Sequence, residues 1–206
     1  MSRFFSTWIL FTVVLTAAAT PCEATGQFSL GAGYARYRES SAMVWDPSWF
    51  LAGAYFFDIM PGLQLGLTAE YHFLEVKPAY ELFGCGTSLG TVDGDGWMFS
   101  LVPALRVPFS VSEDGSTQVY LQGGVGWYHV EMDVLFTGHV IEPASTEIEE
   151  RVIAKWDKPG IDGRFGVVTR LHKALFLELS PGISVIFTDV DATFSLSAYA
   201  ALTFML

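Results

Sequence analysis

The sequence predicts an all-β protein, an eight-stranded antiparallel up-and-down transmembrane β-barrel. Three observations lead to this fold class. Hydrophobic residues make up 51 % of the chain, yet after Ala19 no apolar run approaches the roughly 20 residues of a membrane-spanning helix. Apolar and polar residues instead alternate through eight segments, as they do in strands with one apolar face. The charged residues of these segments gather on the opposite parity, which suits a wall between lipid and a polar interior.

The first element is a predicted signal peptide at residues 1–24. Arg3 precedes an apolar run, Ile9 to Ala19, and small residues follow, which is the order of a secretory signal. We expect cleavage after Ala24, with Ala19 as the alternative, so that residues 25–206 form the outer-membrane β-barrel as a single domain.

The two cysteines predict neither a lipid anchor nor a disulfide. Cys22 could be an acylated lipoprotein cysteine, but Pro21 directly before it departs from that motif. Once the signal is removed, Cys85 is the only thiol, and the mature chain can form no internal disulfide.

The first four predicted strands each carry apolar residues at every second position, at 27–37, 49–59, 63–73 and 97–107. Pro61 and Gly62 predict a tight turn after the second strand, because Pro presets φ and Gly tolerates positive φ. A polar stretch at 38–46 separates the first two strands, and a long Gly-rich loop at 75–96 separates the third and fourth. Pro103, inside the fourth strand, must lie at a bulge or lack a ladder hydrogen bond.

The last four strands are predicted at 118–131, 160–170, 174–187 and 193–206. Residues 112–117 and 171–173 form short turns, and residues 132–158 are predicted to form the longest loop, which is acidic. Connections after the second, fourth and sixth strands are therefore short, and those after the first, third and fifth are longer. This asymmetry is typical of periplasmic turns and extracellular loops.

The final strand resembles the C-terminal insertion signal of bacterial outer-membrane barrels. Leu202, Phe204 and Leu206 share its apolar parity, although the family usually ends in Phe.

A soluble lipocalin-like barrel is the alternative fold. It would keep its apolar face inside and its charges outside. Burying the charged residues of these strands inside a soluble barrel would be costly. In a membrane barrel, a charged residue on the lipid face costs roughly 2 to 4 kcal/mol, which explains why few charged residues occur on the apolar parity. The apolar parity, which is nearly free of charged residues, therefore favours the membrane barrel.

The inward parity predicts a polar network in the lumen. Its members are Asp58, Glu70, His72, Arg106, Asp162, Arg164, Arg170 and Glu178. Eight strands leave an interior just wide enough for side chains to fill, so a salt-bridged plug is favoured over a gated ion path.

No catalytic, cofactor or metal site is predicted. His72 and His129 are the strand histidines that could act as a base, but neither is followed two residues later by the Ser of outer-membrane lipid A deacylases. The stretch from Asp93 to Gly96 is interpreted as a flexible loop tip, since no Glu closes a calcium loop. With 22 acidic residues against 11 basic ones, the chain is not expected to bind nucleic acid.

The segments 120–131 and 175–183 are similar to paired strands of the outer-membrane β-barrel domain family, which includes small OmpA/OmpX-like barrels. The resemblance implies this fold and the outer membrane of a Gram-negative type envelope. The partners expected there are outer-membrane lipid, lipopolysaccharide and the barrel assembly machinery. We expect a structural or surface-interaction module that contacts partners through the loops at 75–96 and 132–158. The alternatives are a lipid A-modifying enzyme or a narrow pore.

Overall fold

The computed structural model describes residues 26–38, 47–76, 81–83, 88–110, 112, 116–140, 146–188 and 192–206. The predicted signal peptide and both candidate cleavage positions lie outside these residues. Within them, no helix is long and apolar enough to cross a membrane.

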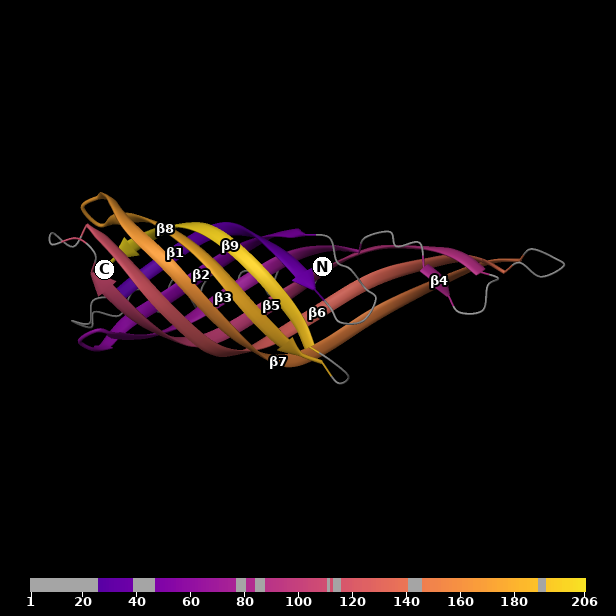
Figure 1. Ribbon diagram of the computed structural model, residues 1–206, viewed down its shortest axis with the longest axis horizontal. Coiled ribbons are helices and arrows are strands. Elements are labelled where there is room, and N and C mark those ends of the chain that lie inside the picture. Colours follow the sequence, from indigo (N-terminus) through magenta and orange to yellow (C-terminus); the bar gives the residue numbers. More distant parts are fainter. Residues whose placement is uncertain are drawn as a thin grey trace, which may run out of the picture.

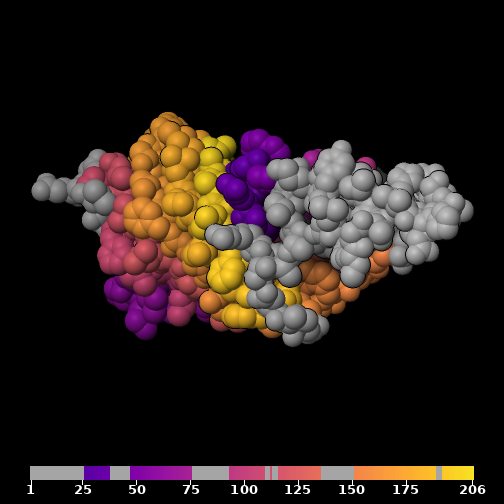
Figure 2. Space-filling model, turned by 45° about the vertical axis from the view of Figure 1, so that its right-hand side comes forward, coloured from indigo at the N-terminus to yellow at the C-terminus, as the bar shows by residue number. Residues whose placement is uncertain are grey.

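Eight antiparallel strands form a closed ring, as the sequence predicts (Figure 1). They are β1 (Gly26–Arg38), β2 (Ser48–Met60), β3 (Leu63–Val76), β5 (Ser88–Ser110), β6 (Thr117–Val140), β7 (Thr146–His172), β8 (Leu175–Phe187) and β9 (Ala192–Met205). β9 pairs with β1 to close the ring, so that the last and first strands lie side by side in Figure 2. The short strand β4 (Glu81–Phe83) pairs only with β5, outside the ring.

The two ends of the barrel differ. At one end, which we call the turn end, Pro61 and Gly62 join β2 to β3 and Lys173 begins the turn into β8. Gly62 has a φ of 78°, a left-handed conformation that side chains disfavour. The tight turn predicted at this position is confirmed. The long connections start from the opposite end.

At that opposite end, β5, β6 and β7 continue far beyond the other strands (Figure 1). Their pairing runs on to Ser88 opposite Val140 and to Val140 opposite Thr146. We call this extension, formed by β4 and by residues 88–96, 130–140 and 146–159, the projecting sheet.

The projecting sheet corrects two predicted loops. Most of 75–96 and of 132–158 is strand, and the stretch from Asp93 to Gly96, predicted to be a flexible loop tip, lies inside β5. The prediction failed because the alternation of apolar and polar residues identifies only strand segments that have one face toward lipid. Strands beyond the membrane can keep their ladder hydrogen bonds without an apolar outer face.

The two parities face lipid and lumen as predicted. Large apolar side chains exposed on the outside include Leu30, Leu51, Leu67, Leu105, Leu121, Phe165, Leu179, Leu196, Leu202, Phe204 and Leu206. In the last strand, Leu202 is 44 % exposed whereas its neighbour Thr203 is fully buried inside. An exposed apolar band of this kind is stable only against lipid, which gives the ring its transmembrane character.

Two prolines interrupt the ladders. Between β5 and β6 the pairing skips Val102 and Pro103, so Pro103 lacks a ladder bond as predicted. Between β7 and β8 it skips the position of Pro181, where the Ser180 hydroxyl donates instead to the carbonyl of Phe165 at 3.0 Å. This side-chain hydrogen bond compensates in part for the backbone N–H donor that Pro181 lacks.

Candidate functional site

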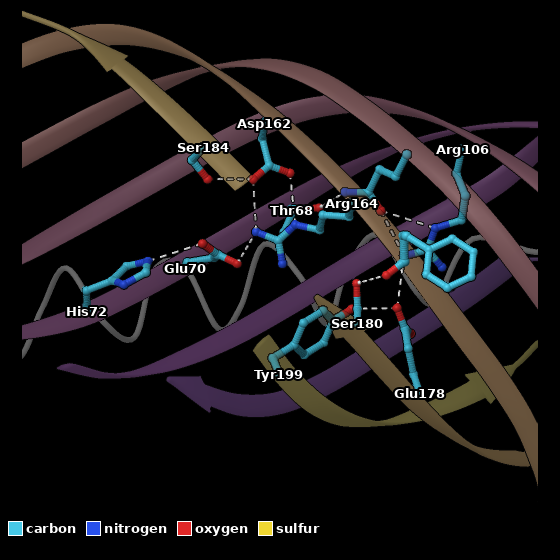
Figure 3. Close-up of polar contacts among 12 residues, drawn as sticks. Thr68, Glu70, His72, Arg106, Asp162, Arg164, Glu178, Ser180, Ser184 and Tyr199 are labelled. Atoms are coloured by element: carbon cyan, nitrogen blue, oxygen red, sulfur yellow. Dashed lines mark hydrogen bonds and ion pairs between the residues drawn. The ribbon is translucent and has the colours of Figure 1, made fainter. Parts of the chain in front are cut away.

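The lumen brings together six of the eight predicted network residues. Glu70, His72, Arg106, Asp162, Arg164 and Glu178 are all buried. They form two clusters, centred on Arg164 and on Glu178 (Figure 3). The other two, Asp58 and Arg170, lie at the turn end, where Asp58 accepts a hydrogen bond from Gln64 and Arg170 lies 5.6 Å from the Phe176 ring.

The first cluster crosses the lumen from β7 to β3. Arg164 donates to both oxygens of Asp162, at 2.8 and 3.2 Å, and to Glu70 Oε1 at 2.5 Å. The Ser184 hydroxyl donates to Asp162 from β8. Buried charges require partners of this kind, because an unpaired ion in a low-dielectric interior is very costly.

His72 extends this cluster toward the projecting end. Its Nε2 lies 3.1 Å from Glu70 Oε2, and its Nδ1 lies 2.5 Å from the hydroxyl of Tyr37. The ring also stacks on Phe50 at 4.6 Å. Both ring nitrogens are thus engaged, and the residue is packed inside the barrel.

The second cluster is a single carboxylate with five donors. Glu178 Oε1 accepts from Arg106 at 3.1 Å and from the hydroxyls of Tyr120 and Tyr199, each at 2.5 Å. Glu178 Oε2 accepts from Ser29 at 2.8 Å and Thr203 at 2.7 Å. The donors come from β5, β6, β9 and β1, so one side chain links five strands, including the pair that closes the ring.

Aromatic rings hold the Arg106 guanidinium in place. Its central carbon lies 3.9 Å from the ring centres of both Phe56 and Tyr120, a double cation–π contact. Arg106 also donates to Gln122, which in turn donates to Thr68 on β3. The second cluster is therefore tied to the opposite wall of the barrel.

Sequence reasoning missed the hydroxyl residues of these clusters. Ser29, Thr68, Ser184 and Thr203 lie on the inward parity but resemble spacers in the sequence. The missing information was the strand register and the curvature of the ring, which bring Ser184 opposite Asp162 on the adjacent strand and Ser29 within reach of Glu178.

Toward the projecting end the lumen becomes apolar. Phe50, Met98, Val130, Met132 and Ile186 belong to one buried cluster there. The interior is thus polar around the two arginines and hydrophobic beyond them, and the prediction of a salt-bridged plug did not include this apolar part.

Outside the barrel, aromatic side chains stack where the apolar band ends. Tyr71 stacks on Trp97 at 5.7 Å, and His129 lies between Trp97 at 5.0 Å and Trp127 at 5.6 Å. His129 Nδ1 also lies 2.8 Å from Asp157 Oδ1. Aromatic rings at this height are typical of the girdle at a membrane–water boundary.

Beyond this girdle, ion pairs join β6 to β7 in the projecting sheet. Lys155 Nζ lies 3.1 Å from Glu131 Oε1. Arg151 donates two hydrogen bonds to the Asp133 carboxylate, one of them from Nε at 2.7 Å. The hydrogen bond from Arg151 lowers the pKa of the Asp133 carboxyl from its ordinary value. With the contact between His129 and Asp157, three cross-strand pairs follow one another where the two strands leave the barrel.

The pairing of β7 with β8 covers only part of β7. Its pairing with β8 ends at Gly160 opposite Ile186, whereas β7 itself begins at Thr146. Within the described part of the chain, the register of residues 146–157 is therefore with β6 and not with β8. Such an edge presents backbone hydrogen-bonding groups to any strand that can lie along it.

No family model matches the sequence, and no curated protein matches it either. Solved structures match the fold. Neisserial surface protein A aligns with a TM-score of 0.55 at 12 % identity, over 87 % of this chain and 96 % of that one. The outer membrane protein OprG of Pseudomonas aeruginosa aligns with a TM-score of 0.54 at 13 % identity, over 89 % and 97 %. A major outer membrane protein of Thermus thermophilus aligns with a TM-score of 0.52 at 17 % identity, over 88 % and 99 %. At these identities the likeness establishes the fold.

Proposed function

We propose that this chain, which has the fold of the small outer-membrane β-barrels, is an outer-membrane module that contacts surface partners through its projecting sheet. A signal peptide at residues 1–24 directs its export, and the barrel assembly machinery inserts it among lipid and lipopolysaccharide. The turn end faces the periplasm, and the projecting sheet stands outside the cell.

The length of the projecting strands carries this proposal. A membrane-spanning strand needs about 9–11 residues, whereas β6 has 24 and β7 has 27. The surplus is an ordered sheet with cross-strand ion pairs between β6 and β7, and within the described residues the register of its residues 146–157 is with β6 and not with β8. Strand addition to such an edge is a common mode of protein recognition, in which backbone hydrogen bonds supply affinity.

The geometry gives less support to the two alternatives. A lipid A-modifying enzyme would need a nucleophile beside its histidine, but His129 contacts Asp157, and His72 contacts Glu70 and Tyr37. A narrow pore would need a continuous path, but Arg164 and Glu70 bridge the lumen from wall to wall.

The first experiment tests where the projecting sheet lies. In a Cys85→Ser background, Ile153→Cys places a thiol at an outward position that is 61 % exposed. A membrane-impermeant maleimide should label it on intact cells. Lys173→Cys, at the turn end, is the matched control and should react only after the cells are permeabilised. If the Lys173→Cys variant alone were labelled on intact cells, the turn end of the barrel would face outside, and the proposal would be contradicted.

The second experiment tests what the sheet does. Residues 134–152 are replaced by Asn-Gly, a two-residue hairpin turn, because Asp133 and Ile153 lie opposite each other in the β6–β7 register. The shortened barrel retains its lumen clusters, so it should still migrate faster on gels unheated than boiled. Cells producing it should lose the clumping or attachment that the full-length protein gives. Unchanged clumping and attachment would contradict a role for the sheet.

A further inference from the structure

Arg106 and Gln64 each present a buried polar atom that needs a partner. Both side chains lie inside the lumen, with 1 % and 3 % of their surfaces exposed. Within the described part of the chain, neither Arg106 Nη1 nor Gln64 Oε1 has a hydrogen-bond partner. Native proteins rarely leave such atoms unpaired, because a buried polar group that loses its hydration without gaining a hydrogen bond is destabilising.

The two residues are direct neighbours across the strand pair β3–β5. Gln64 lies opposite Arg106 in the register, and both residues are on the inward parity. Directly opposite residues of an antiparallel pair have Cβ atoms about 4.5–5.5 Å apart. The donor and the acceptor that need partners therefore belong to side chains that start from adjacent positions on the same face of the sheet.

Asp58 fixes the orientation of the Gln64 amide. Gln64 Nε2 donates to Asp58 Oδ1 at 3.0 Å. A carboxylate accepts hydrogen bonds and does not donate them, so the amide must turn its nitrogen toward Asp58. The opposite orientation would place two acceptor oxygens against each other. Gln64 Oε1 is thus held away from Asp58, where it needs a donor.

Neighbouring side chains occupy the rest of the Arg106 guanidinium. Nε and Nη2 both donate to Gln122 Oε1, at 3.2 and 3.0 Å, and Nη2 also donates to Glu178. The ring centres of Phe56 and Tyr120 each lie 3.9 Å from Cζ. Because Gln122 takes the edge formed by Nε and Nη2, Nη1 lies on the side of Cζ away from Gln122. Its N–H groups lie in the plane of the guanidinium and need an acceptor there.

The chemistry of these two atoms defines what can join them. Arg106 Nη1 only donates, so the bound group must accept, and Gln64 Oε1 only accepts, so the same group must donate. Chloride and carboxylates cannot donate, whereas ammonium and metal cations cannot accept. Water does both, and it is the molecule that commonly bridges buried polar atoms, with two to four hydrogen bonds. A larger alcohol is excluded because both side chains are almost completely buried.

We propose that the lumen binds one ordered water molecule between Arg106 and Gln64, which accepts from Nη1 and donates to Oε1. This water site lies inside the barrel wall and does not depend on the projecting sheet. It can therefore be present whether or not the proposed surface role is correct.

The water joins the turn end to the second lumen cluster. On one side, Gln64 links it to Asp58 on β2. On the other side, Arg106 links it to Gln122 on β6 and to Glu178 on β8, and Glu178 in turn binds hydroxyl groups of β1 and β9. Side-chain hydrogen bonds then run without interruption from β2 to the strand pair that closes the ring.

A crystal structure of the wild-type protein in detergent, at a resolution that shows ordered waters, tests the site directly. A single density peak should lie at hydrogen-bond distance, about 2.7–3.2 Å, from both Arg106 Nη1 and Gln64 Oε1. A direct hydrogen bond between these two atoms would overturn the proposal. So would an absence of density, or a peak that contacts Nη1 alone, as an anion would.

Magnetic resonance of the protein in lipid bilayers gives a second readout. Cross peaks between water and the Nη1 protons of Arg106 should be present in the wild type and lost in Gln64→Leu, which carries no acceptor. Asp58→Asn is the matched control, because its amide oxygen still accepts from Gln64 Nε2, and the cross peaks should remain.

Cross peaks that persist in Gln64→Leu, or that disappear in both variants, would show that Gln64 does not hold the water. If Gln64→Leu fails to fold, the wild-type density and the wild-type cross peaks decide the question.

Discussion

At the scale of single residues, the lumen depends on carboxylates that each collect donors from several strands. Glu178 accepts five hydrogen bonds and is fully buried. Glu70 joins Arg164 to His72 across the first cluster. Because the donors come from different strands, each carboxylate acts as a crosslink that chain connectivity does not supply.

Replacing Glu178 by Gln should therefore be strongly destabilising. The amide keeps the shape but leaves the buried Arg106 cation without its counter-charge, and breaking a buried pair costs about 3 to 5 kcal/mol. Urea unfolding in lipid or detergent, followed by gel migration, measures the loss. Glu75→Gln is the matched control, since Glu75 is an exposed glutamate of β3, and it should change stability little. Equal stability of the two variants would contradict the crosslinking role.

Two glycines of β7 provide a second comparison at this scale. A Cβ on Gly166 would overlap the Tyr120 ring, whereas a Cβ on Gly163 would have only Ile183 near it, at 3.8 Å. Gly166→Ala should therefore cost about 1 to 3 kcal/mol through overpacking. Gly163→Ala should be neutral or slightly stabilising, because it reduces the freedom of the unfolded chain. The same urea unfolding assay measures the stability of both variants. If Gly163→Ala were the less stable of the two, the Tyr120 ring would have to move aside without cost in Gly166→Ala.

At the scale of elements, β7 passes through two environments. Residues 160–169 lie between β6 and β8, whereas the described register of residues 146–157 is with β6 and not with β8. One half of β7 is thus part of the barrel wall, and the other half is an edge strand of the projecting sheet.

Amide hydrogen exchange should divide β7 at Gly160. In detergent, about every second amide of residues 146–157 should exchange fast, because its N–H points away from β6. Amides of residues 160–170 should stay protected. Uniform protection along the whole strand would contradict a free edge.

At the scale of the whole molecule, the ring is closed and its interior is filled. β1 and β9 pair over twelve residues of β1, from Gln27 to Arg38. Two polar clusters and an apolar layer succeed each other along the lumen. The molecule is therefore a closed wall with a packed core.

Planar bilayers containing the purified protein should show no discrete conductance. The Arg164–Glu70 contact crosses the lumen, and the apolar layer beyond it gives ions no hydration. Heat-modifiable migration of the same sample shows that the barrel is folded, so that an absence of current is meaningful. Discrete channel openings would revive the narrow pore.

Much of this architecture could be predicted because each strand obeys a local rule. A residue of a membrane-spanning strand must face lipid or lumen, and alternation records that choice position by position. For this reason the strand number, the turn at Pro61 and Gly62, and the outward placement of Leu202 are all readable from the sequence. The inward parity likewise contains every member of the two lumen clusters.

What only the tertiary structure decided is which inward residues meet and where the strands end. Arg164 and Glu70 are 94 residues apart and Ser29 and Glu178 are 149 apart, and their contacts depend on the curvature that closes the ring. The projecting sheet was hidden for a related reason. By itself, the sequence determined the barrel because lipid imposes an alternating pattern on every strand that crosses it. Outside the lipid that constraint ends, and pairing with neighbouring strands alone decides how far β5, β6 and β7 extend.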